Sequence, residues 1–200
     1  MKTASRLRVS LCIAALGLLA GCSSSQPKHW DLTYIGGVMP PLQFTLVGDN
    51  GEPVTAANFA GKVVLLYFGY THCPDVCPTT LADLAQALRL LGAEANKVSV
   101  LFVSVDPKRD TPAVLKSYAA AFAPQVVGLS GSQEQLESLT KRYRVAYRLG
   151  EPDTHGNYVV YHSSAVFIFD SSGRVRLLAS DSDLPQAIAH DLRQLLNLSA

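Results

Sequence analysis

Hydrophobic and polar positions divide the chain into segments that predict alternating strands and helices. Two continuous apolar runs, Val63–Tyr70 and Val98–Val105, are typical of strands that are buried on both faces of a sheet. Between them, leucine and alanine recur at helical spacing from Leu81 to Leu91, and Gly92 follows as a stop signal. The centre of the chain therefore predicts a strand, helix, strand unit.

The segments on either side extend this pattern into a complete α/β domain. Alternating apolar positions around the turn Asp49-Asn50-Gly51 predict an N-terminal β-hairpin, after an irregular lead-in over residues 30–41. The remaining predicted elements are a helix capped by Thr111 and ending at Phe122, a strand at 125–129, a helix at 132–143, a hairpin at 165–170 and 175–179, and a helix at 183–196. This order predicts an α/β sandwich with a mixed sheet.

The first 21 residues do not fit the domain and predict an export signal instead. Lys2, Arg6 and Arg8 precede an apolar stretch that ends at Gly21, which is shorter than the roughly 20 residues of a transmembrane helix. Its end, Leu19-Ala20-Gly21-Cys22, resembles the lipobox of bacterial lipoproteins; an ordinary signal with an incidental cysteine is the alternative. The resemblance implies that Cys22 is lipidated and becomes the N-terminus of the mature chain.

We therefore predict three parts: a signal peptide at 1–21, a lipidated tether at 22–40 and one domain at 41–200. Serines after Cys22 suit a flexible tether. The expected location is the cell envelope, with the lipid in a membrane and the domain on the periplasmic or other extracytoplasmic side. Of the 200 residues only 16% are charged and the net charge is +1, so no basic surface for nucleic acid is expected.

After removal of the signal, Cys73 and Cys77 are the two thiols left, because Cys12 is cut off and Cys22 is blocked. A disulfide between them closes a very short loop and adds little stability. They lie between a buried strand and a helix that has Pro78 in its first turn, so we expect both thiols to be more acidic than a free cysteine. Such a pair can close a disulfide, or bind a soft metal with a third ligand from elsewhere.

Two segments carry a family resemblance: Gly69-Tyr70-Thr71-His72-Cys73-Pro74-Asp75-Val76-Cys77-Pro78-Thr79-Thr80-Leu81 and Ser104-Val105-Asp106-Pro107-Lys108-Arg109-Asp110-Thr111-Pro112. They resemble the Sco/SenC family of copper-binding, thioredoxin-like proteins involved in cytochrome c oxidase assembly, and the resemblance runs from about Phe44 to Leu196. It implies a thioredoxin-like three-layer sandwich, with a central mixed sheet flanked by helices. It also implies one copper ion, as Cu(I) or Cu(II), on a Cys-x3-Cys motif plus a distal histidine.

The residues that match this ligand set are Cys73, Cys77 and His162. One departure lies beside the histidine, where Tyr161 stands in place of the aspartate that is common in the family. A carboxylate at that position could tune the histidine, so the substitution bears on copper affinity.

The resemblance favours a metallochaperone that delivers copper to the binuclear copper centre of cytochrome c oxidase subunit II, or to another copper protein, as a monomer. The alternative is a thiol–disulfide oxidoreductase, with Cys73 and Cys77 as its catalytic redox pair, that keeps the cysteines of that copper centre or other exported thiols reduced. His162 distinguishes the two functions, because redox exchange needs only the cysteines.

Other polar residues near the motifs have less specific interpretations. His72 is expected to point away from Cys73 and not to bind metal. Asp106 either lines the crevice or forms a turn, and Asp75 either aids copper release or has no specific part. Asp110 is interpreted as part of a helix start, and Arg109 as a solvated charge.

Overall fold

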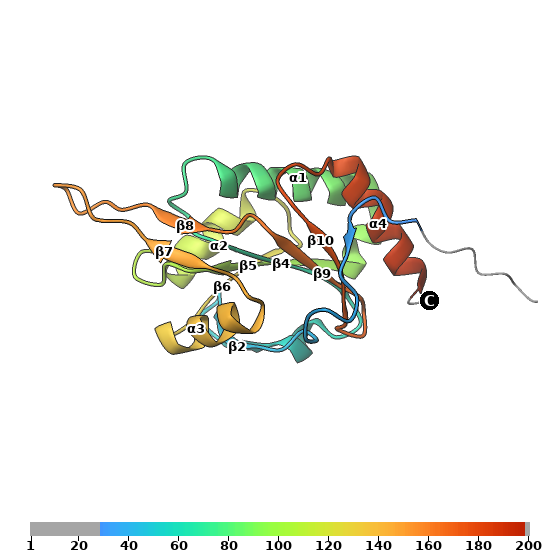
Figure 1. Cartoon of the computed structure of the whole chain (residues 1–200), viewed down its shortest axis with the longest axis horizontal. Coiled ribbons are helices and arrows are strands. Elements are labelled where there is room, and N and C mark those ends of the chain that lie inside the picture. Colours follow the sequence, from blue (N-terminus) through green and yellow to red (C-terminus); the bar gives the residue numbers. More distant parts are fainter. Residues whose placement is uncertain (1–28, 199–200) are drawn as a thin grey trace, which may run out of the picture.

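The computed structural model describes residues 29–198, in which an eight-stranded sheet carries helices on both sides (Figure 1). The strands are β1 (Thr33–Tyr34), β2 (Thr45–Gly48), β3 (Pro53–Thr55), β4 (Val63–Gly69), β5 (Val98–Ser104), β6 (Val126–Ser130), β7 (Tyr147–Leu149), β8 (Val160–His162), β9 (Val166–Phe169) and β10 (Val175–Ala179). The helices are α1 (Val76–Leu91), α2 (Pro112–Ala120), α3 (Gln133–Arg142) and α4 (Pro185–Leu198), with 3-10 helices at Ala56–Phe59 and Gly92–Lys97.

The sheet is mixed, with the strand order β1-β10-β9-β4-β5-β6-β2-β3. Its centre, β4-β5-β6, is parallel, and the pairings of the outer strands are antiparallel. Every residue of β4 and β5 is buried, as their continuous apolar runs predict. In Figure 1, α1 and α4 pack together on one side of the sheet and α3 lies on the other.

Parallel pairing of β4 with β5 sets the position of the two sequence motifs. Gly69, the last residue of β4, is in register with Ser104, the last residue of β5. Because both strands end at the same edge of the sheet, the loop after β4 and the loop after β5 lie side by side. The two motifs that carry the family resemblance therefore meet at one place.

The lead-in at 30–41, expected to be irregular, contributes a strand. Thr33–Tyr34 pairs with β10 at the sheet edge, and Leu32 beside it is buried. Asp191 of α4 is fully buried and accepts the Leu32 N–H at 2.9 Å. A two-residue strand carries too little alternation to be recognised in the sequence, and its pairing partner lies far along the chain.

A second hairpin, β7–β8, was also not predicted. It forms a separate two-stranded sheet, with Tyr147 opposite His162, and its tip extends beyond the main sheet in Figure 1. Its strands have three residues each and its connecting segment is exposed, so no long apolar pattern marks it.

No helix within residues 29–198 is long and apolar enough to cross a bilayer. The predicted signal peptide at 1–21 and the lipid attachment at Cys22 lie outside the described residues, so both stay predictions.

Candidate metal centre

The loop between β4 and α1 holds both cysteines at the carboxyl end of the central strand. Helix α1 begins at Val76, with Asp75 as its N-cap, so Cys77 lies in the first turn and is fully buried. The Cys77 N–H donates to the Cys73 sulfur at 3.4 Å, which turns the two side chains toward each other. Gly69 makes room for this arrangement, because a Cβ there would lie 2.9 Å from the Cys77 sulfur.

The two thiols have opposite pKa shifts, which corrects the expectation that both are acidic. Burial raises the pKa of the Cys73 thiol, but hydrogen bonds from the backbone of Asp75, Cys77 and Val76 outweigh it and leave that pKa below its usual value. At Cys77 burial dominates and raises the pKa to about 12. A position near the helix start is therefore not sufficient for acidity when the sulfur is shielded from water.

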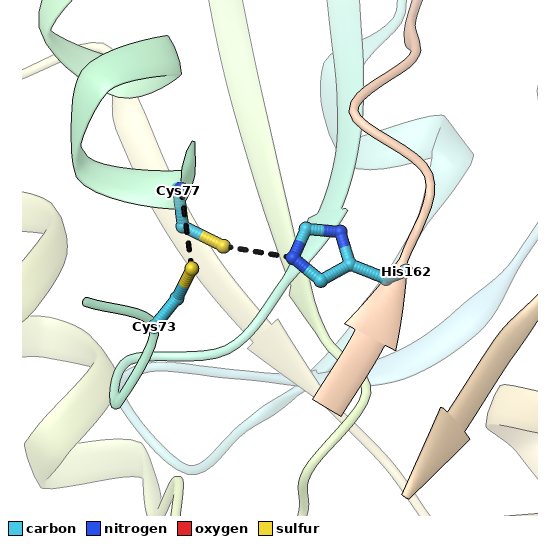
Figure 2. A group of neighbouring side chains, drawn as sticks. All are labelled: Cys73, Cys77 and His162. Carbon is cyan, nitrogen blue, oxygen red and sulfur yellow. Dashed lines mark hydrogen bonds between the residues drawn. The ribbon is translucent and has the colours of Figure 1, made fainter. Parts of the chain in front are cut away.

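His162, the last residue of β8, completes the group from the opposite side (Figure 2). Its Nδ1–H donates to the Ser163 carbonyl at 2.9 Å, which leaves the Nε2 lone pair directed at the Cys77 sulfur, 3.1 Å away. Burial lowers the pKa of His162, so the imidazole is neutral at neutral pH and able to bind a metal.

Two tyrosine rings from β4 and its loop enclose the imidazole. The Tyr70 ring meets His162 edge-on, with centroids 5.9 Å apart and planes at 87°. The Tyr67 ring approaches it at 6.1 Å and 67°. Both tyrosines are almost completely buried, so they form the walls that separate the imidazole from water on these sides.

The ligand atoms of Cys73, Cys77 and His162 all lie within 4.8 Å of one another. Two thiolates and a neutral imidazole form a soft donor set that suits copper, and three protein ligands do not complete the four-coordinate shell of structural zinc. The donor set therefore fits the copper ion that the sequence implied. The structure brings together the three residues that the family resemblance implied as ligands, although Cys77 and His162 are 85 residues apart.

Asp110, interpreted from sequence as part of a helix start, is instead a buried anchor for the cysteine loop. Its carboxylate accepts the Thr71 N–H at 3.0 Å and the Thr71 and Ser104 hydroxyls at 2.6 Å each. It is only 1% exposed. The helix start is provided by Thr111, which caps α2 as predicted.

Arg109, expected to be a solvated charge, is largely covered. Its Nε donates to the Asp106 carboxylate, and its guanidinium lies over the Tyr158 ring, 3.7 Å from the centroid. Asp106 is 2% exposed and also accepts the Tyr158 hydroxyl at 2.7 Å. Asp106 is therefore more than a turn residue, and no local sequence signal reveals its partner 52 positions away.

The two other polar residues near the motif stay outside the ligand group. His72 contacts the Thr71 hydroxyl at 3.1 Å and lies 3.6 Å from Asp110, while its side chain is half exposed. Asp75 is the N-cap of α1 and makes no side-chain capping hydrogen bond.

A family model described as SCO1/SenC matches residues 41–197. The chain is 43% identical over 132 residues to "Protein SCO2 homolog, mitochondrial" of Bos taurus, an alignment that covers 65% of this chain and 50% of the relative. It is 37% identical over 145 residues to the "SCO2-like protein" of Rickettsia felis, covering 72% of this chain and 68% of that protein. The chain thus spans about half the length of the bovine relative.

Solved structures agree with this match. ScoI of Bradyrhizobium japonicum, solved with copper bound, is 40% identical at a TM-score of 0.71, covering 81% of this chain and 99% of that one. Apo Sco1 of Thermus thermophilus is 41% identical with a TM-score of 0.72, and the match covers 83% of this chain and 99% of that one. These similarities confirm the predicted α/β, thioredoxin-like fold class. The chain belongs to the SCO1/SenC family.

Proposed function

We propose that this protein is a copper-binding factor of cytochrome c oxidase assembly that carries one copper ion on Cys73, Cys77 and His162. The observation that carries the proposal is the convergence of two sulfurs and one imidazole nitrogen within 4.8 Å. Copper-bound structures of relatives such as the Bradyrhizobium ScoI support it. We further propose that the copper is delivered to the binuclear centre of oxidase subunit II, or to another copper protein.

Cys73, Cys77 and His162 have different roles in binding the copper ion. Cys73 has the lower thiol pKa and is partly exposed, so it loses its proton first and is accessible to an incoming ligand of the acceptor. Cys77 is buried, and binding of a cation compensates the cost of ionising its thiol. The two thiolates favour Cu(I), and the neutral His162 contributes a borderline nitrogen that also accepts Cu(II). Release by stepwise ligand exchange would therefore begin at Cys73.

The unequal thiols also favour the second candidate, a thiol–disulfide oxidoreductase. In that reaction the Cys73 thiolate attacks a partner disulfide and forms a mixed disulfide, releasing one partner thiolate. Cys77, after losing its proton, attacks the Cys73 sulfur and releases the second. The partner gains two electrons, and the Cys73–Cys77 pair is oxidised to a disulfide. A partly exposed nucleophile beside a buried second thiol is the arrangement that this sequence of steps requires.

Copper titration of the reduced protein and its His162→Ala variant tests the proposal. We expect the variant to lose most Cu(II) binding and the thiolate-to-copper charge-transfer absorption, while exchange by Cys73 and Cys77 remains. His155→Ala, an exposed histidine on the β7–β8 hairpin, is the matched control. Equal copper affinity of wild type and His162→Ala would contradict the ligand assignment. A variant without copper that still supports oxidase assembly in cells would favour the oxidoreductase.

We also propose that Cys22 carries the lipid that anchors the protein in an envelope membrane, and that the folded domain acts as a monomer on the extracytoplasmic side. The lipoprotein of Bacillus anthracis in the same family, 25% identical with a TM-score of 0.66, supports the anchor. Mass spectrometry of the mature N-terminus tests it: an unmodified N-terminus at another residue would contradict the assignment of Cys22.

A further inference from the structure

The ligands of the candidate metal centre come from two parts of the fold that belong to separate sheets. Cys73 and Cys77 lie on the loop that continues from the central strand β4, but His162 lies on β8, which pairs with β7 in a separate sheet. Two-stranded hairpins have little stability of their own. The position of the imidazole therefore depends on the contacts that hold this hairpin against the main domain.

Side chains of the β5–α2 loop make such a contact. The Tyr158 hydroxyl, two residues before β8, donates to Asp106 Oδ1 at 2.7 Å. Arg109 donates from Nε to the other oxygen of the same carboxylate and stacks on the Tyr158 ring at 3.7 Å. We call these three residues, Asp106, Arg109 and Tyr158, the clasp. Asp106 is 2% exposed, and both of its carboxylate oxygens accept a hydrogen bond, one from Tyr158 and one from Arg109.

The clasp also reaches the wall of the metal centre. The Arg109 guanidinium lies 5.7 Å from the Tyr70 ring centroid, on the loop that carries the cysteines. Tyr70 in turn packs edge-on against His162. Arg109 therefore lies near aromatic rings of both parts, Tyr158 from the hairpin and Tyr70 from the cysteine loop.

The charges of the clasp suit a persistent contact. Arg109 and Asp106 neutralise each other where the side chains are 20% and 2% exposed. Burial, and then the hydrogen bond to Asp106, raise the pKa of Tyr158, so its hydroxyl stays protonated and able to donate. A charge-assisted hydrogen bond in a largely covered position is stronger than one in water.

We propose that Asp106, Arg109 and Tyr158 are positioning residues for copper binding, because they hold the hairpin so that His162 Nε2 lies at the two sulfurs. The inference rests on the proposed function and adds residues that do not touch the ion. The apparent dissociation constant of a site equals the intrinsic one divided by the fraction of molecules in the competent form. If loss of one clasp contact leaves the hairpin docked in about one molecule in ten, Cu(II) binds about tenfold more weakly.

Tyr158→Phe is the primary variant, because it removes one oxygen and keeps the ring on Arg109. Tyr34→Phe, an exposed tyrosine of β1 whose ring centroid lies 5.9 Å from the Arg176 guanidinium, is the matched control outside the hairpin. We expect Tyr158→Phe to weaken Cu(II) binding about tenfold and to speed amide hydrogen exchange at residues 160–162 of the metal-free protein. Dithiol–disulfide exchange by Cys73 and Cys77 should be unchanged, and Tyr34→Phe should match the wild type.

Arg109→Gln is the second variant and removes both the ion pair and the stacked cation. Wild-type copper affinity in both variants overturns the proposal, even if hydrogen exchange is faster, because the docking of the hairpin then does not limit binding. A lower melting temperature with unchanged affinity and exchange also overturns it. If the wild type itself binds no copper, the proposed function fails, while hairpin exchange in the metal-free variants still decides whether the clasp holds His162 in place.

Discussion

The two sides of the candidate metal centre are held in place in different ways. The cysteine side continues directly from β4, whose seven residues are all buried. Asp110 accepts two hydrogen bonds from Thr71 in its loop and a third from Ser104 at the end of β5. The histidine side is a hairpin with three-residue strands and an exposed tip. The thiols are therefore placed by the core of the domain, and the imidazole is placed by the contacts that dock a peripheral hairpin against that core.

This difference separates fold stability from ligand placement. Changes in the central sheet are expected to unfold the whole domain, whereas changes in the hairpin are expected to move only His162. A site built in this way can keep its dithiol pair intact while the third ligand is displaced, which would suit the delivery of copper that we propose.

The largest contrast is expected when a buried aliphatic residue of each region is replaced by alanine, because the two variants should lose stability and copper affinity to different extents. Ile168→Ala in β9 removes a fully buried side chain and should lower the free energy of unfolding by about 2–5 kcal/mol. Val160→Ala in β8 should lower it less but weaken Cu(II) binding more. Urea unfolding and copper titration of both variants measure this. Equal losses of stability would show that the hairpin belongs to the same cooperative unit as the sheet.

Within the cysteine side, Cys73 should be alkylated far faster than Cys77 at neutral pH. The pKa of Cys73 lies below 9.0 and that of Cys77 is about 12, so at neutral pH the thiolate fraction of Cys73 is larger by about a thousandfold or more. The greater nucleophilicity of the more basic thiolate offsets part of this, which leaves about 30-fold or more. Peptide mass spectrometry after timed iodoacetamide treatment measures the ratio, and equal rates would contradict it.

Asp110→Asn tests the anchor of the cysteine loop. A neutral amide oxygen accepts hydrogen bonds more weakly than a carboxylate, and the amide group adds donors facing Thr71 and Ser104. We expect a loss of about 1–2 kcal/mol in the free energy of unfolding. Asp181→Asn, an exposed position, serves as the control in urea titrations monitored by circular dichroism. No difference between the two variants would mean that the buried carboxylate does not hold the loop.

The last contrast concerns the histidine side alone. An imidazolium cannot bind a metal, so the contribution of His162 is complete above its pKa and is lost as the pH falls through it. Burial lowers this pKa from 6.5, so protonation of His162 should begin to weaken copper binding only below pH 6.5. Below the pKa, the copper affinity of the wild type should fall by up to about tenfold per pH unit more than that of His162→Ala. Copper titrations of both proteins across pH 4.5–8 check it, since parallel curves would exclude His162 as a ligand.

Local patterns in the sequence determined most of the main domain. A strand buried on both faces requires a continuous apolar run, so β4 and β5 could be predicted from Val63–Tyr70 and Val98–Val105. Thr111 and Pro112 signal the start of α2 because capping depends on neighbouring residues. The position of Cys73 and Cys77 between a predicted strand and a predicted helix likewise indicated the cysteine side of the candidate site. The family resemblance, and not the local pattern, indicated His162.

Only the tertiary structure decided the chemistry of individual side chains. Cys77 looks acidic from its place near a helix start, but the sheet buries it and raises its pKa to about 12. Arg109 looks solvated and Asp110 looks like part of a helix start, but their partners Tyr158 and Thr71 come from distant segments. Periodicity and caps act between near neighbours and can be read along the chain, whereas burial and the pairing of charges depend on atoms that only the folded chain brings together.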